Sequence, residues 1–152
     1  MPAPKFLLDT NILFHLLRAD ELGKYVEAQY RLREVPYRPF ISIVTAAEIW
    51  SLVSRRGLGE TRREALEKMM ANVLAVDISD RSVLDAYIGI DLFSHSQGIS
   101  MGKNDLWIAA TAKVTQATLL TTDKDFDHLD PKYLRRVWID PEKFRLSPIK
   151  DK

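Results

Sequence analysis

The chain has 152 residues, of which 46% are hydrophobic and 28% are charged, so we expect one globular domain rather than two domains or a disordered chain. It contains no cysteine, which excludes disulfides, thiolate metal sites and a cysteine nucleophile. The 22 lysines and arginines nearly balance the 21 acidic residues, and the resulting net charge of +1 does not by itself indicate a partner.

Apolar and helical patterns alternate along the chain. In chain order they predict a strand over 5–8, a helix after Asp9, a helix over 21–34, a strand over 40–44, helices over 45–56 and 61–71, a strand over 73–78, helices over 79–93 and 105–114, and strands over 118–122 and 137–139. This alternation predicts an α/β fold with a mostly parallel sheet and helices on both faces.

Three further expectations concern the whole chain. The longest apolar stretch, residues 12–17, is far shorter than the ~20 residues that span a bilayer, so we expect a soluble, cytoplasmic protein. We expect a single domain over 1–140 and a polar, loosely held tail over 141–152. In the helix over 79–93, helical spacing predicts a buried face made of Val83, Leu84, Tyr87, Ile88 and Leu92.

Four acidic residues lie where strands meet helices. Asp9 and Asp123 each follow a predicted strand, while Glu48 and Asp105 lie near the start of predicted helices. In a parallel sheet, such positions meet at the carboxyl edge, so we expect the four carboxylates to lie together if their strands are neighbours. An all-oxygen site of this kind suits Mg²⁺ or Mn²⁺, which can activate water for hydrolysis of a phosphodiester.

Each of these acids also has a purely structural interpretation. Thr45 and Glu48 have the spacing of a capping box, in which Glu48 would only return a hydrogen bond to the backbone. Asp9, Asp105 and Asp123 could each cap a helix or a turn, or lie favourably near a helix dipole. The sequence leaves both interpretations open.

The segments that carry the acids resemble a known family. They are Phe6-Leu-Leu-Asp9-Thr-Asn11, Thr45-Ala-Ala-Glu48-Ile, Asn104-Asp105-Leu-Trp-Ile-Ala-Ala110 and Leu120-Thr-Thr-Asp123-Lys-Asp125-Phe126. In this order and spacing they resemble the successive motifs of PIN-domain ribonucleases, and in particular the VapC-type toxins of bacterial and archaeal toxin–antitoxin pairs. The resemblance covers about residues 5–140.

The resemblance implies a three-layer α/β/α fold with strand order 3-2-1-4-5. It implies a metal-dependent endoribonuclease that binds Mg²⁺ or Mn²⁺ through Asp9, Glu48, Asp105 and Asp123, with Asp125 sharing or replacing the role of Asp123. It also implies an RNA substrate, a small antitoxin and a homodimer. Three other polar residues, Thr10, Asn11 and Thr122, occupy positions where the family has side chains that orient the carboxylates or water. Alternatively, these three are only cap and turn residues.

Basic residues surround the predicted site. Arg55, Arg56, Arg62 and Arg63 flank the break at residues 57–59, and Lys103 precedes Asp105. They could bind RNA phosphates or an antitoxin. Alternatively, they could form a solvated helical face, because the acidic residues Glu60, Glu64 and Glu67 lie in the same segment.

Three alternative functions remain. A phosphatase that uses Asp9 as its nucleophile would need a second acid at position 11, where this chain has Asn11. A PIN-like binding module without chemistry would be expected to have lost some of the carboxylates, and all four are present. A housekeeping RNA-processing nuclease without an antitoxin has the same sequence features as a toxin.

Overall fold

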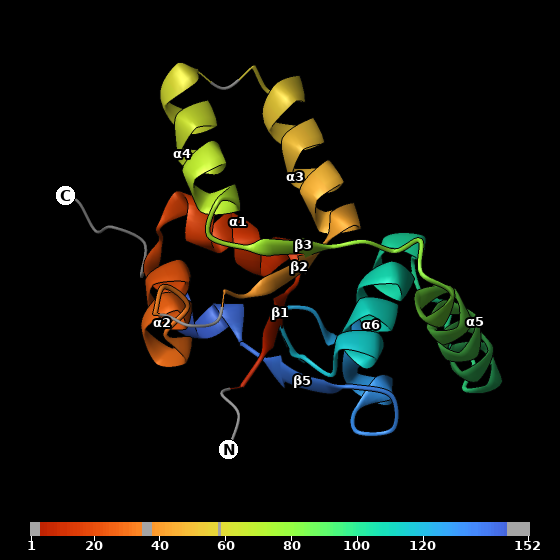
Figure 1. Cartoon of the computed structure of the whole chain (residues 1–152). Helices are drawn as coiled ribbons and strands as arrows, with labels where there is room; N and C mark the ends of the chain where they lie inside the picture. The colour runs from red at the N-terminus through yellow and green to blue at the C-terminus, as the bar shows by residue number, and fades with distance from the viewer. Residues whose placement is uncertain (1–3, 35–37, 58, 146–152) are drawn as a thin grey trace.

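The computed structural model describes residues 4–34, 38–57 and 59–145. Its centre is a five-stranded, all-parallel sheet with the order β3-β2-β1-β4-β5 (Figure 1). The strands are β1 (Phe6–Leu8), β2 (Phe40–Ser42), β3 (Leu74–Val76), β4 (Thr118–Thr121) and β5 (Arg135–Trp138). The predicted fold class and the strand order implied by the resemblance are confirmed.

Helices cover both faces of the sheet, which gives the three layers (Figure 1). Side chains alternate along a strand, so Leu8 and Leu120 face one side while Leu7 and Leu119 face the other. The first side packs against α1 (Thr10–Arg18), α2 (Glu21–Tyr30), α3 (Ile43–Arg55) and α4 (Glu60–Met70). The second packs against α5 (Arg81–Ser96), α6 (Lys103–Thr115) and the short 3₁₀ helix η1 (Lys124–Leu129).

The order of the strands brings two predicted site residues together. β1 and β4 are neighbours, and Leu8 is the register partner of Leu120. The backbone N–H of Asp9 continues this pairing by donating to the Leu120 carbonyl at 3.0 Å. Asp9 therefore leaves the sheet beside Thr121, two residues before Asp123.

One helix begins earlier than the sequence predicts. β2 ends at Ser42, whose hydroxyl accepts a hydrogen bond from the backbone N–H of Val44 at 3.1 Å and so caps α3. Because α3 begins at Ile43 rather than Thr45, Glu48 lies in its second turn and not its first. The capping-box interpretation of Thr45 and Glu48 is therefore wrong.

The predicted buried face of α5 is also partly wrong. Val83 is buried, as expected, but the other buried positions are Ala86, Ile90 and Ser94. Leu84, Ile88 and Leu92 are 41%, 55% and 65% exposed. Tyr87 is partly buried and packs against Trp107 of α6. α5 packs mainly on α6 along the side that carries Val83, Ala86 and Tyr87, so the side that carries Leu84, Ile88 and Leu92 is left exposed.

The predicted tail begins with ordered structure. Pro141–Phe144 form a 3₁₀ helix, η2, and the Phe144 ring lies 5.1 Å from that of Tyr25 in α2. Residues 146–152 lie outside the described part of the chain, so the tail remains a prediction there. No helix among the described residues is long and apolar enough to cross a membrane.

Candidate metal centre

The four acids singled out from the sequence line one hollow of about 560 Å³ at the carboxyl edge of the sheet. Asp9 lies between β1 and α1, Glu48 in α3, Asp105 in α6, and Asp123 just after β4. Four segments that are far apart in the sequence therefore contribute one carboxylate each to the same small volume.

Asp9 is the most deeply buried of the four, with 4% of its surface exposed. One carboxylate oxygen accepts from the backbone N–H of Thr10 at 2.8 Å, so Asp9 does cap α1. The other accepts from the Thr121 hydroxyl at 2.7 Å. The pKa of Asp9 is raised to about 6, mainly by burial; the two hydrogen bonds oppose the rise, and the charges of Asp123 and Glu48 add to it.

Glu48 is held by two uncharged donors. The Thr10 hydroxyl donates to one carboxylate oxygen at 2.8 Å, and the Asn104 side-chain amide donates to the other at 2.9 Å. The Thr10 hydroxyl also lies 3.1 Å from the hydroxyl of Thr45, which is buried beneath it. Glu48 is thereby fixed between α1 and α6, and each of its oxygens keeps a lone pair for a further ligand.

Asp105 interacts with the charges of all four other acids. One oxygen from each of Asp105, Asp123 and Asp125 lies within 4.8 Å of the others. The pKa of Asp105 is raised to about 7, mainly by burial and in addition by the charges of the four neighbouring acids. Asp105 is the third residue of α6, whose N-cap is Gly102, so it does not cap the helix.

Asp123 and Asp125 are also linked through the backbone. Asp123 caps η1 by accepting from the backbone N–H of Asp125 at 2.9 Å. Burial and the adjacent Asp123 charge raise the pKa of Asp125. The tightest group of acids thus includes Asp125, which the resemblance implied as sharing or replacing the role of Asp123.

The negative charge of this group is not neutralised by a salt bridge. Across the described ranges, no side-chain nitrogen of a lysine or arginine lies within 4.0 Å of an oxygen of the five carboxylates. Burial and, after it, the charges of the neighbouring acids raise the pKa values of Asp9 and Asp105. Oxygen donors in this number and arrangement fit a hard divalent cation such as Mg²⁺ or Mn²⁺.

The three polar residues predicted to support the acids differ in their contacts. Thr10 contacts Glu48, and Asn11 lines the hollow. Thr122 has no side-chain hydrogen bond to an acid within the described segments, whereas Thr121 contacts Asp9. The sequence analysis missed Thr121 and Asn104. The register of β1 and β4 could have identified Thr121, because Leu8 pairs with Leu120 and the next residues, Asp9 and Thr121, lie side by side. The contact of Asn104 with Glu48 could not be predicted in this way, because it depends on how α6 packs against α3.

The predicted basic residues do not act as one group. Arg55 lines the acidic hollow, while Arg56 and Arg62 line a neighbouring hollow of about 340 Å³. Arg63 lies over the Trp50 ring at 5.5 Å and pairs with Glu67 at 3.7 Å. Lys103 is exposed at the start of α6.

The raised pKa values predict how stability depends on pH without metal. The folded protein binds more protons at Asp9 and Asp105 than the unfolded chain between about pH 4 and pH 7, so these groups destabilise the fold as pH rises through that range. In chelator, we expect Asp105→Asn to melt at a higher temperature than wild type at pH 7.5 and to lose less stability between pH 5 and pH 8. Thermal melts measure both effects.

The exposed Asp85, which pairs with Arg81 on α5, provides the matched control. Asp85→Asn should stay within about 0.5 kcal/mol of wild type. If Asp105→Asn instead loses about 1 kcal/mol at pH 7.5, Asp105 mainly supports the helix N-terminus and the repulsion described above is not significant.

Comparisons with known proteins agree with this geometry. The family model described as "PIN domain" matches residues 6–132. No curated protein matches the chain by sequence.

Several solved structures share the fold. A chain of VapBC2 from Rickettsia felis, bound to a DNA fragment from its promoter, is 22% identical, with a TM-score of 0.74 over 90% of this chain and 99% of that one. A chain of VapBC-1 from nontypeable Haemophilus influenzae is 25% identical, with a TM-score of 0.70 over 88% and 97%. A chain of DNA-bound VapBC from Salmonella typhimurium is 20% identical, with a TM-score of 0.68 over 88% and 97%. Since the family model covers most of its length, the chain belongs to the PIN domain family.

Proposed function

We propose that this protein is a Mg²⁺- or Mn²⁺-dependent endoribonuclease that acts in the cytoplasm as the toxin of a toxin–antitoxin pair. One observation carries the proposal: carboxylates from four separate segments of a PIN domain meet in one hollow and form no salt bridge with a lysine or arginine among the described residues. The solved structures with this fold include a toxin–antitoxin complex and a member of the VapBC family of toxin–antitoxin systems, which supports the assignment as a toxin.

The residues of the hollow have distinct roles in this mechanism. Asp9, Glu48, Asp105 and Asp123 would hold the cation, and Asp125 is near enough to share in binding. A bound divalent cation lowers the pKa of water and stabilises the charge that develops on a phosphodiester.

The neighbouring neutral side chains fix the geometry of the acids. Thr10 and Asn104 orient Glu48, and Thr121 orients Asp9. Because none of these donors carries a charge, they leave the negative charge of the carboxylates available to a cation.

The first test of this function is cleavage of total RNA with and without Mg²⁺ or Mn²⁺. We expect cleavage only with metal, and rates lower by orders of magnitude for Asp105→Asn and Glu48→Gln, because each loses a ligand charge. Asp85→Asn serves as the control and should cleave normally. Undiminished cleavage by both site variants at limiting and saturating Mn²⁺ would exclude the proposed site.

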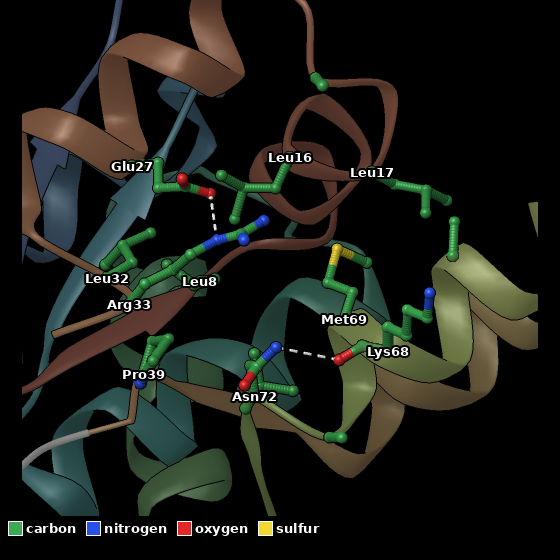
Figure 2. A pocket seen from close by; sticks show the side chains of 14 residues that line it. Leu8, Leu16, Leu17, Glu27, Leu32, Arg33, Pro39, Lys68, Met69 and Asn72 are labelled. Carbon is green, nitrogen blue, oxygen red and sulfur yellow. Dashed lines mark hydrogen bonds and ion pairs between the residues drawn. The ribbon is translucent and has the colours of Figure 1, made fainter. Parts of the chain in front are cut away.

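An apolar groove supports the proposal of an antitoxin partner. It has a volume of about 540 Å³ and lies between α1 and α4, with Leu16, Leu17 and Met69 among its lining side chains (Figure 2). The Glu27–Arg33 ion pair, at 2.9 Å, lies at one side of the groove. An open apolar surface with a polar rim suits the apolar face of a partner segment.

This groove is connected to the acidic hollow. It shares Leu17 and Ala65 with the hollow lined by Arg56 and Arg62. That hollow in turn shares Phe14 and Leu52 with the acidic one. A partner segment in the groove would therefore lie on a continuous path to the carboxylates.

A charge placed in the groove should separate antitoxin binding from catalysis. Ala65 is exposed on α4 and lines both the apolar groove and the hollow that contains Arg56 and Arg62. Ala65→Glu should therefore weaken capture of a small protein encoded directly upstream by about tenfold or more, since a charge in the groove would be desolvated by the partner. RNA cleavage should remain. Ala28→Glu, at an exposed position of α2, is the matched control. Equal capture by Ala65→Glu and wild type would show that the groove is not the antitoxin site.

The exposed side of α5 supports the proposal of a homodimer. Leu84, Ile88 and Leu92 are spaced four residues apart, so they form one apolar stripe on the side of α5 away from α6. A stripe of this kind can pair with its own copy around a two-fold axis. We expect light scattering to find a dimer for wild type and a monomer for Ile88→Lys, with Gln29→Lys on α2 as the control. A dimer that persists in Ile88→Lys would contradict this interface.

Two other nuclease or binding functions fit less of the structure. A housekeeping RNA-processing nuclease would use the same acids but would need neither the apolar groove nor an upstream partner. A non-catalytic binding module would gain nothing from a crowded group of carboxylates whose pKa values are raised.

A further inference from the structure

Arg55 differs from the other basic residues near the site because it lines the acidic hollow itself. It is the last residue of α3, seven positions after Glu48, which corresponds to about 10 Å along the helix axis. Ser51 lies between them and lines the same hollow. The spacing of three and four residues places all three on one face of α3.

Helical side chains lean toward the N-terminus of their own helix, so the Arg55 side chain covers the turn that contains Ser51. This direction leads toward Glu48 and the other acids. Arg55 is therefore placed to reach a ligand that extends from the carboxylates along α3.

The guanidinium of Arg55 is not needed to neutralise the acids. In residues 4–34, 38–57 and 59–145, no carboxylate lies within 4.0 Å of Arg55. Glu48, the nearest acid along α3, is occupied by Thr10 and Asn104 instead. Arg63 shows the contrasting case, because it contacts both Trp50 and Glu67.

We propose that Arg55 binds a backbone phosphate of the RNA, next to the phosphodiester that lies at the carboxylates. A guanidinium can bind two phosphate oxygens at once and so fix the position of the RNA strand along α3. Arg56 and Arg62, which line the neighbouring hollow, have no part in this subsite. The inference rests on the proposed ribonuclease function and adds the direction in which the RNA strand leaves the site.

The test combines RNA binding, cleavage kinetics and metal binding in Arg55→Ala, Arg55→Lys and wild type. Fluorescence anisotropy of a single-stranded oligoribonucleotide across a salt series should show about tenfold weaker binding for Arg55→Ala. The slope of log K against log salt should fall by about 0.7. In Mn²⁺, KM should rise while kcat stays within about twofold, as expected for a lost contact that is equal in ground and transition states. Arg55→Lys should recover part of the affinity.

Two controls separate this role from a structural one. Arg56→Ala should match wild type in KM and in salt slope. Mn²⁺ affinity, measured by calorimetry without RNA, should be the same in Arg55→Ala and wild type. A changed Mn²⁺ affinity would overturn the inference, because Arg55 would then act on the carboxylates rather than on RNA.

The outcomes distinguish this inference from the proposed function. Normal cleavage by wild type with an unchanged KM and salt slope in Arg55→Ala would overturn the Arg55 subsite alone. The same result with loss of capture of the upstream-encoded protein would assign Arg55 to the partner surface instead. If wild type neither binds nor cleaves RNA, both proposals are wrong. If it binds RNA without cleaving it, the salt slope of Arg55→Ala still decides the subsite.

Discussion

Electrostatic repulsion among uncompensated carboxylates is the constraint on which the rest of this structure depends. Asp9 and Asp105 would be ionised well below neutral pH in water, yet burial and their acidic neighbours raise their pKa values to about 6 and about 7. The acidic group at one edge of the sheet lowers the stability of the fold, and the buried cores on both faces of the sheet offset this loss. Local arrangements that disfavour stability are common at functional sites.

The parallel sheet explains how separate acids meet. Neighbouring parallel strands end at the same edge, so Asp9 and Asp123 emerge together, and α3 starts from the strand on the other side of β1. Neutral donors then orient the carboxylates without neutralising them, as Thr10 and Asn104 do for Glu48. A lysine or arginine in either place would supply the charge that we expect a metal ion to supply.

Much of this could be predicted from the sequence, and the errors have physical causes. Short apolar runs alternating with helices predicted the layers, and the spacing of four motifs identified the PIN domain family. Because Ser42 caps α3, the helix begins at Ile43 rather than at the predicted Thr45, and Glu48 therefore does not have the position of a capping-box residue. Leu84, Ile88 and Leu92 follow a helical period, but periodicity alone does not show which side of α5 packs on α6. Asn104 was missed because its partner lies 56 residues away on another helix.

The most direct test of the account is a crystal structure of the protein soaked in Mn²⁺ at pH 7.5, with anomalous diffraction data to locate the metal. The account predicts a peak in the acidic hollow, at coordination distance from Asp105 and at least two of Asp9, Glu48, Asp123 and Asp125. The same experiment on Asp105→Asn should show a weaker peak or none. A well-ordered hollow without an anomalous peak in the wild-type crystal, or a peak only at other surface acids, would contradict the central claim.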